Sequence, residues 1–383
     1  MRTFFDKYKI NDNVLAVGVS GGSDSLALVL RLHEELVPQG KKIIALTVDH
    51  QLRPESRDEA LFVHELMQQY GIEHHILVWK GEKPQTGIEE AARQARYKLL
   101  SDWCLSHDVR CLCVAHHRLD QAETFLMRLQ RGSGLNGLCG MQAVSELYGL
   151  KILRPFLNEH PDDLKAYLKS KNITWVTDSS NNCDDFLRVR IRKFLPLMEA
   201  ETGITAQRLV DTMTVLQRSR NYIMEQVNKF IKNHVRFWDN IGVSLSLSVL
   251  GQQHEEIIYR VLAELIKKVG QNDYTPRAEE VERLTGYLKE KFEGVNFTSV
   301  KLDDIASLKA NFSESHFKGA TLGHCEIFVA QGKIWIVPEL KLKTRMSKKN
   351  WENFVSCYPE YAKFQLPYKL RVALVKSKMK VEF

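Results

Sequence analysis

The sequence predicts an α/β protein with a doubly wound parallel sheet, followed by a helical segment and a small α+β C-terminal domain. Short apolar runs alternate with amphipathic stretches in the first part of the chain, and a glycine-rich turn directly follows the first run. This alternation is typical of parallel strands covered by helices on both faces. The pattern changes near residue 205, where long helical stretches begin. Because 383 residues are too many for one ordinary core, we expect two or three domains.

The apolar runs of the first 200 residues predict four strands, at residues 14–19, 43–48, 76–79 and 111–115. Continuous apolar character is expected of strands that are buried on both faces. Helices are predicted after the glycine-rich turn and at residues 55–70, 88–105 and 120–130. Ligands of such sheets bind beyond the carboxyl ends of the strands, so we expect the functional residues there.

The rest of the chain predicts helices and one hairpin. The helices cover residues 206–235, 252–269 and 276–291, and the hairpin joins residues 325–329 to 333–337. We therefore expect a catalytic domain at residues 1–204 and a C-terminal helical and α+β domain at residues 205–340. Residues 341–383 would form a basic extension, either part of that domain or a further small one.

The charge of the chain is concentrated at its C-terminal end. Residues 340–383 contain 11 Lys or Arg and 3 Glu, a net charge of +8, whereas the whole chain carries +7. This asymmetry indicates a polyanionic partner that contacts the C-terminal end, with a solvated tail as the alternative.

The seven cysteines are odd in number and contain no CxxC pair, so neither a disulfide framework nor a zinc site is predicted. The N-terminus has no apolar signal core, and no run reaches about 18 apolar residues. We expect a cytoplasmic protein that does not interact with a membrane.

The strongest functional signal is the loop Ser20-Gly21-Gly22-Ser23-Asp24-Ser25, which follows the first strand and opens a helix. Its glycines allow several N–H groups to face one point, and the helix N-terminus adds partial positive charge. The serine hydroxyls add further donors, so the loop predicts an anion cradle, with a plain glycine-rich turn as the alternative. It lacks the Gly-Lys-Ser/Thr ending and the GxGxxG pattern of other nucleotide loops. Asp24 would repel a phosphate unless a cation lay between them, which predicts bound Mg²⁺.

The SGGSDS loop resembles that of the N-type ATP pyrophosphatases, which cleave ATP between its α- and β-phosphates. Further segments resemble the tRNA(Ile)-lysidine synthetase family: VDHQLR at 48–53, ARQARY at 92–97, AHHRLDQAETFLMRLQRGSGLNGLCGM at 115–141, and DSSN at 178–181 followed by Arg188, Arg190 and Arg192. Val189 stands where that family usually has Asn, which puts an RNA contact by this side chain in doubt. The resemblance is strong over residues 13–200 and weak over residues 205–340.

The resemblance implies the N-type ATP pyrophosphatase fold and a two-step reaction that uses ATP and Mg²⁺. ATP would adenylate the C2 carbonyl oxygen of the wobble cytidine in a tRNA(Ile) with a CAU anticodon. The ε-amine of free L-lysine would then displace AMP. The domain at residues 205–340 would contact the tRNA. The sequence leaves the oligomeric state open, a homodimer included.

His116, Asp120 and Glu123 are spaced i, i+4, i+7 and would share one face if the turn at His116 is helical. Two carboxylates suit the ammonium group of lysine, with a solvated helix face as the alternative. Lysine has to lose a proton before it attacks, and a carboxylate or His116 could accept that proton. For His116 we favour a contact with ATP phosphate. Together with Asp24 and Arg96, these residues are our catalytic candidates.

The arginines are expected to meet phosphate groups. Arg96 would neutralise charge on the adenylate, or be an ordinary exposed helix residue. Arg131 begins a glycine-rich loop that either approaches RNA or only ends a helix. Arg188, Arg190 and Arg192 would pair with tRNA phosphates, with a plain basic helix end as the alternative. The resemblance implies that Asp49 and Arg53 lie near the base and ribose of ATP, and we expect His50 and His117 to support the residues around them.

Three rival functions compete with a lysidine synthetase. A tRNA thiolase of the same superfamily generally needs paired cysteines, but Cys111 and Cys113 fall in a predicted buried strand, a poor place for iron–sulfur ligation. A small-molecule amide ligase related to the GMP and NAD synthetases would explain SGGSDS but not the long run from Ala115. A non-catalytic tRNA-binding protein is disfavoured by the intact loop and by Asp120 and Glu123.

Overall fold

The computed structural model describes residues 1–84, 86–176, 187–238, 242–272, 275–293, 320–330, 332–339 and 356. The chain divides into two compact units, Met1–Arg220 and Asn221–Phe383, and each is described by itself. The DSSN segment at 178–181 and the basic extension at 341–383, apart from residue 356, lie outside the described residues.

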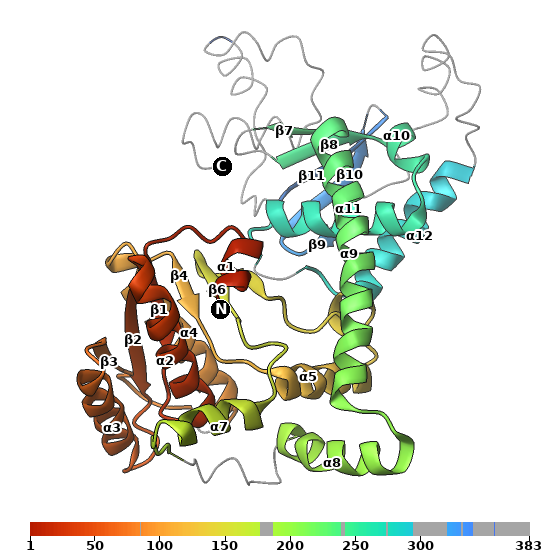
Figure 1. Cartoon of the computed structure of the whole chain (residues 1–383). Coiled ribbons are helices and arrows are strands. Elements are labelled where there is room, and N and C mark those ends of the chain that lie inside the picture. Colours follow the sequence, from red (N-terminus) through yellow and green to blue (C-terminus); the bar gives the residue numbers. More distant parts are fainter. Residues whose placement is uncertain are drawn as a thin grey trace. The chain divides into compact units, whose positions relative to one another are not determined.

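A six-stranded, mostly parallel sheet organises the first unit (Figure 1). Its strands are β1 (Val14–Gly18), β2 (Lys42–Asp49), β3 (Glu73–Val78), β4 (Cys111–Cys113), β5 (Val144–Leu147) and β6 (Leu150–Leu153), in the order β3-β2-β1-β4-β6-β5. All neighbouring pairs are parallel except β5 and β6. The chain crosses to the other half of the sheet between β1 and β4, and the crevice at such a switch point is where ligands bind.

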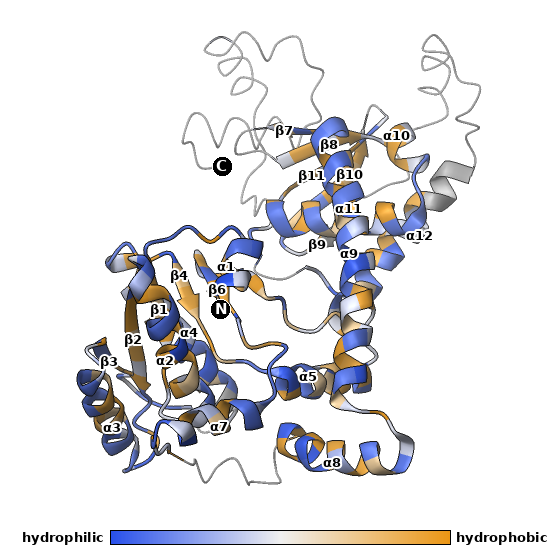
Figure 2. Cartoon of the chain, in the orientation of Figure 1, coloured by the Kyte–Doolittle hydropathy of each residue, from blue (hydrophilic) through white to orange (hydrophobic). Residues whose placement is uncertain are grey.

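Helices cover both faces of this sheet. On one face lie α1 (Arg2–Lys7), α2 (Ser23–Leu36), α3 (Ser56–Gln69) and α7 (Pro161–Ser170), and on the other lies α4 (Ile88–Ser106); the 3₁₀ turn η1 (Val37–Gln39) follows α2. A separate apolar cluster joins α5 (Arg118–Gln130), α6 (Leu135–Leu138), α8 (Leu187–Thr202) and the first half of α9 (Ala206–His234). Successive strand residues point to opposite faces. Leu15 and Val17 therefore pack with α2, α3 and α7, whereas Ala16 packs with Tyr97 and Leu100 of α4. Apolar residues fill these strands, as Figure 2 shows. The expected doubly wound α/β fold is confirmed.

The β5–β6 hairpin was not predicted. Tyr148 and Gly149 form its turn with φ angles of 49° and 77°. Two-residue hairpin turns need such left-handed angles at both positions, which favours Asn-Gly over Tyr-Gly. The hairpin matters for the site because β6 lies beside β4 and extends the edge at which the functional loops meet.

The second unit is built around an antiparallel sheet of five strands in the order β7-β8-β11-β10-β9. These are β7 (Val235–Trp238), β8 (Gly242–Ser246), β9 (Ala320–Leu322), β10 (Cys325–Ala330) and β11 (Lys333–Pro338), and the helices are α10 (Leu247–Gly251), α11 (Glu255–Val269) and α12 (Ala278–Glu293). Leu262 and Ile266 of α11 share a core with Ile327 and Ile336 of the sheet. The predicted hairpin at 325–337 is present.

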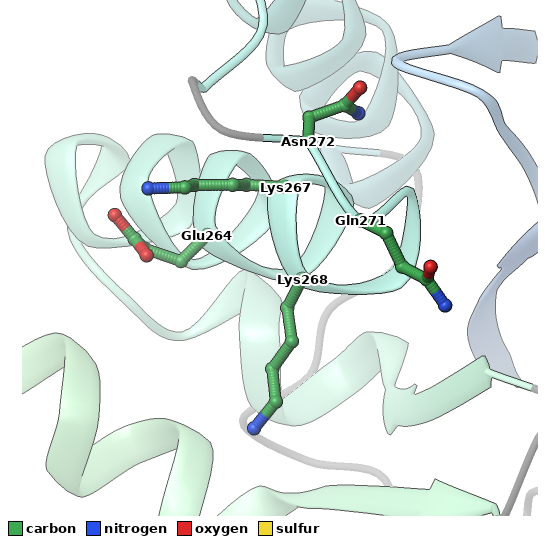
Figure 3. Close-up of a pocket in the computed structure, with 5 residues that line it drawn as sticks. All are labelled: Glu264, Lys267, Lys268, Gln271 and Asn272. Atoms are coloured by element: carbon green, nitrogen blue, oxygen red, sulfur yellow. The ribbon is translucent and has the colours of Figure 1, made fainter. Parts of the chain in front are cut away.

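A shallow depression lies at the C-terminal end of α11. It is lined by Glu264, Lys267, Lys268, Gln271 and Asn272, whose side chains point in different directions (Figure 3). Polar groups therefore do not converge on one point there, and we assign no chemistry to it. Among the helices that the structure describes, none is both long and apolar enough to cross a membrane.

Candidate nucleotide and acid–base site

The glycine-rich loop has the geometry of an anion cradle. Ser25 Oγ accepts a hydrogen bond from Ser20 N at 3.1 Å and donates one to Gly22 O at 3.0 Å, which closes the loop over the first turn of α2. Gly21 has a φ of +84°, and a Cβ there would lie 3.2 Å from Val176 and 3.3 Å from Val63. Only glycine fits this position, and the tight turn leads directly into the N-terminus of α2, where N–H groups attract anions.

Asp24 and His117 face each other across the switch point. Asp24 lies in the first turn of α2 with a third of its side chain exposed, and its Oδ2 is 3.6 Å from Nε2 of His117. Burial raises the pKa of Asp24, and the nearby His117 opposes that rise. The described residues contain no cluster of three or more His, Cys, Asp or Glu side chains that could enclose a metal. A Mg²⁺ at Asp24 would therefore take most of its ligands from phosphate oxygens and water, as Mg²⁺ commonly does.

His117 also starts α5. Its Nδ1 accepts from Asp120 N at 3.3 Å, while Asp120 Oδ2 accepts from His117 N at 3.0 Å, which is a reciprocal helix cap. Since Nδ1 accepts a hydrogen bond, the proton of the neutral ring is on Nε2, the nitrogen that faces Asp24. The residue before it, His116, is not in a helical turn, because α5 begins at Arg118. The expected single face of His116, Asp120 and Glu123 is therefore wrong for His116.

Glu123 is completely buried and is held by two arginines of α8. Its Oε2 accepts from Arg188 Nε at 2.6 Å and its Oε1 accepts from Arg192 Nε at 2.7 Å. Arg188 also reaches Asp120 Oδ1 at 3.3 Å. Burial acts to raise the pKa of Asp120, but the charges of His117 and Arg188 leave it lowered. Short polar contacts thus connect Asp24, His117 and Asp120 to Arg188 of α8.

Three arginines, Arg93, Arg154 and Arg188, lie near enough to His116 to affect its pKa. Burial, and after it the charges of Arg154, Arg93 and Arg188, lowers the pKa of His116 to about 3, against the pull of Asp120. Arg154 follows β6, is 8% exposed, and donates from Nη1 to Gln142 O and Ser145 Oγ, both at 2.9 Å. Among the described residues, neither Nδ1 of His116 nor Nε of Arg154 has a hydrogen-bond partner. Buried polar atoms are rarely left without a partner, so this region differs from an ordinary packed core.

The comparisons with known proteins identify the family of the chain. The PP-loop domain family matches residues 1–198. The tRNA(Ile)-lysidine synthase of Wolbachia pipientis wMel is 37% identical over 290 residues, which is 75% of this chain and 67% of that protein. That of Hyphomonas neptunium is 33% identical over 337 residues, covering 86% of this chain and 83% of that protein. The chain belongs to the tRNA(Ile)-lysidine synthase family.

These matches confirm the family that the sequence motifs predicted. They also confirm the predicted enzyme class, an ATP-dependent carbon–nitrogen ligase. Among solved structures, a U34-tRNA thiolase from Methanococcus maripaludis is similar, with a TM-score of 0.49 and 18% identity over 56% of this chain and 78% of that one. A likeness at that level carries no argument about activity. The roles of individual residues in this member of the lysidine synthase family stay predictions.

The candidate residues at the end of β2 and just after it, Asp49 and Arg53, already bond to other side chains or to the backbone. Asp49 is 2% exposed and accepts from Gln51 N at 3.0 Å and Ser56 Oγ at 2.7 Å, so it shapes the turn into α3. Arg53 pairs with Glu59 at 3.1 Å. Burial lowers the pKa of His50 to about 4, and the positive charge of Arg96 adds to this effect. Arg96 is therefore close enough to His50 for their charges to interact.

The remaining arginines differ in whether they pair with a carboxylate. Arg188 and Arg192 both pair with Glu123 although 36% and 42% of their side chains are exposed, whereas Arg190 and Arg131 are exposed residues. Val189 is buried, with 7% of it exposed, so the usual Asn of the lysidine synthase family is replaced at a packed position of α8. Arg154 was not predicted as a site residue, because the strand before it was not predicted, and His117 was predicted only to support its neighbours.

The glycine-rich loop after α5 is fixed by side chains of α5 and α9. Arg128 Nη1 donates to Gly137 O at 2.7 Å and to Gly140 O at 3.0 Å. Gln121 bonds both the N–H and the carbonyl of Met141, and Gln217 Nε2 donates to Cys139 O at 2.6 Å. This segment is a fixed platform whose first residues, Arg131 and Gly132, end α5.

Proposed function

We propose that this chain ligates free L-lysine to C2 of the wobble cytidine of a tRNA(Ile) with a CAU anticodon, through an adenylated tRNA, with release of AMP and pyrophosphate. The observation that carries the proposal is the meeting of the nucleotide loop and an acidic site at one switch point. Asp24 of the loop lies 3.6 Å from His117, which also caps the helix bearing Asp120 and Glu123. An activated carbonyl and an amine have to meet at such a short distance for the ligation to occur.

ATP would bind with its phosphates on the loop Ser20–Ser25. Mg²⁺ at Asp24 would screen the charge between the carboxylate and the phosphates and stabilise the leaving pyrophosphate. Arg96 and Arg154, whose Nε has no hydrogen-bond partner among the described residues, would face the remaining phosphate charge. His116 suits a hydrogen bond to phosphate better than proton removal, because a pKa of about 3 makes its ring a weak base near neutral pH.

Lysine would bind with its ammonium group at Asp120 and Glu123. Both carboxylates already accept bonds from arginines, but two carboxylate oxygens offer about four acceptor positions, so further donors can be accepted. Arg188 would keep Asp120 ionised and hold both carboxylates in place. Asp120, whose lowered pKa keeps it an anion, would hold the ammonium group in place while the amine loses its proton.

The tRNA would contact exposed basic groups. Arg190 and Arg131 are exposed on the first unit, and the second unit and the basic extension would add further phosphate contacts. Such an enzyme would work in the cytoplasm, where its tRNA is.

A thiolase remains the second candidate, and the cysteines argue against it. Cys111 and Cys113 are buried within β4, and burial raises the pKa of both thiols, that of Cys111 to about 12. A thiolate that ligates a cluster or carries sulfur needs the opposite environment. A small-molecule amide ligase would not need the exposed arginines beside the site.

The test is an incubation of the full-length protein with ATP, Mg²⁺, labelled lysine and a cognate tRNA transcript, followed by nucleoside analysis. We expect label on one cytidine, with AMP and pyrophosphate formed in equal amounts. The matched control replaces the wobble cytidine of the transcript by uridine and should remain unlabelled. Formation of ADP, or label on the 3′ end of the tRNA, would contradict the proposal.

A further inference from the structure

A line of hydrogen bonds runs from α3 to the last residue before the nucleotide loop. Gln68 Nε2 is 3.2 Å from His64 Nε2, and His64 Nδ1 is 3.1 Å from His74 Nδ1. His74 Nε2 is 2.8 Å from Thr47 Oγ1, which donates to Val19 O at 2.8 Å. The line therefore connects α3, β3 and β2 to the point where the chain leaves β1 and enters the loop.

The direction of every bond in this line follows from its last acceptor. Val19 O can only accept, so the hydroxyl hydrogen of Thr47 is committed to it and Thr47 Oγ1 accepts from His74. The proton of His74 is then on Nε2, its Nδ1 accepts from His64 Nδ1–H, and His64 Nε2 accepts from Gln68. Burial, and after it the nearby His64 and His75, lowers the pKa of His74 to about 4, so the ring is neutral near pH 7.

The same helix supports the loop at a second point. Val63, next to His64 in α3, lies against Gly21, where an added Cβ would be 3.3 Å from it. Thr47 itself is 4% exposed, so water does not compete freely for the bond to Val19 O. Two independent contacts from one region thus fix the loop, one at its entrance and one at its tightest turn.

We propose that Thr47 is a positioning residue for the nucleotide: its hydroxyl, held in one orientation by His74 and His64, fixes the carbonyl of Val19 and thereby the direction of the N–H groups in Ser20–Ser25. This rests on the proposed function only for the identity of the ligand as ATP. Thr47 touches the backbone and not the substrate, so its loss weakens nucleotide binding rather than the use of lysine.

The test compares three variants of the full-length protein by equilibrium binding of ATP with Mg²⁺, without lysine or tRNA. Thr47→Val keeps the shape but removes the hydroxyl, and we expect ATP to bind about 3- to 10-fold more weakly, as for one lost hydrogen bond. Thr47→Ser restores the hydroxyl and should bind like wild type. The matched control is Thr285→Val in α12, where another buried threonine hydroxyl donates to a backbone carbonyl, that of Val281, at 2.8 Å.

Thr285→Val also removes a buried threonine hydroxyl but does not touch the loop, so it should leave ATP binding unchanged. Equal ATP affinity in folded Thr47→Val and wild type would overturn the proposal. Should Thr47→Val fail to fold, ¹⁵N NMR of wild-type histidines decides: the proposal requires a proton on Nε2 of His74 and a shift of that signal on addition of ATP. A proton on Nδ1, or an unmoved signal, overturns it. Because ATP binding is measured alone, absence of lysidine formation by wild type would refute the proposed function without deciding this inference.

Discussion

His117 connects the nucleotide loop to the carboxylates of α5 through its two ring nitrogens. Nδ1 accepts from Asp120 N and so starts the helix, while Nε2 faces Asp24 at 3.6 Å. One side chain thus caps a helix with one ring nitrogen and faces a carboxylate with the other. Asparagine is also a good helix cap, but it is too short to present a second donor toward Asp24.

We predict that His117→Asn separates these two roles. The cap is retained, so the free energy of unfolding should change by less than about 1 kcal/mol. The donor facing Asp24 is lost, so exchange of pyrophosphate into ATP in the presence of tRNA should slow by about 10-fold or more, the usual scale for one polar group acting at a reaction centre. The control is His160→Asn, since His160 Nδ1 likewise caps α7 by accepting from Asp162 N. Equal exchange rates in the two variants would show that His117 only caps.

The segment between α5 and β5 is held in place by side chains of two helices, α5 and α9. Arg128, Gln121 and Gln217 bond its backbone, and Gly140 brings it into close contact with α9. Gly140 has a φ of +66°, and an added Cβ would meet the sulfur of Met213 and lie 2.8 Å from Gln121 Oε1. Gly132, near the other end of the segment, has nearly the same φ of +65° but nothing within 4 Å of an added Cβ.

Alanine substitutions at Gly132 and Gly140 distinguish the cost of a left-handed backbone from the cost of a steric clash. Both alanine variants carry the cost of a left-handed alanine, about 1 kcal/mol. Gly140→Ala should lose about 1–3 kcal/mol more, because the extra carbon overfills a packed contact. Denaturant unfolding of the two variants measures the difference. If Gly132→Ala is as destabilising as Gly140→Ala, the contact with α9 does not constrain the loop.

The sequence predicted the elements that carry strong periodicity and missed those defined by distant contacts. The strands and helices around the loop Ser20–Ser25 were predicted within a few residues, since the sheet buries continuous apolar runs. The pairing of Glu123 with Arg188 and Arg192 was not predicted, because it joins residues 65 and 69 positions apart. Arg154 had no sequence signal, because the strand β6 before it was not predicted and its partners Gln142 and Ser145 become neighbours only through the β5–β6 hairpin.

For the whole molecule, buried neutral histidines determine how stability depends on pH. Burial, as the largest cause, lowers the pKa of His50 and His74 to about 4 and that of His116 to about 3. In an unfolded chain each would have a pKa of about 6.5. Between these values the unfolded chain binds protons that the folded chain does not, so acidification favours unfolding. Asp24, with a raised pKa, acts in the opposite sense, but it is one group against three.

We predict that the free energy of unfolding is nearly constant above pH 7 and falls as the pH is lowered from about 6.5 toward 4. Removing one of these groups by His74→Asn should flatten the fall by at most about 1.4 kcal/mol per pH unit, the slope of one proton. Urea unfolding at several pH values measures both curves. Parallel curves for wild type and variant would mean that His74 is not held neutral.

The bonds that fix the segment after α5 end on main-chain atoms, and this has an evolutionary consequence. Gly137, Cys139, Gly140 and Met141 are held through carbonyl and N–H groups, and at Cys139 and Met141 these bonds do not depend on the side chain that the residue carries. The shape of the segment is thus encoded largely in side chains of α5 and α9, with Gly137 and Gly140 required where an added Cβ would clash. Related enzymes can therefore diverge in what this surface recognises without rebuilding it, and substitutions should accumulate on the segment faster than at Gln121 or Arg128.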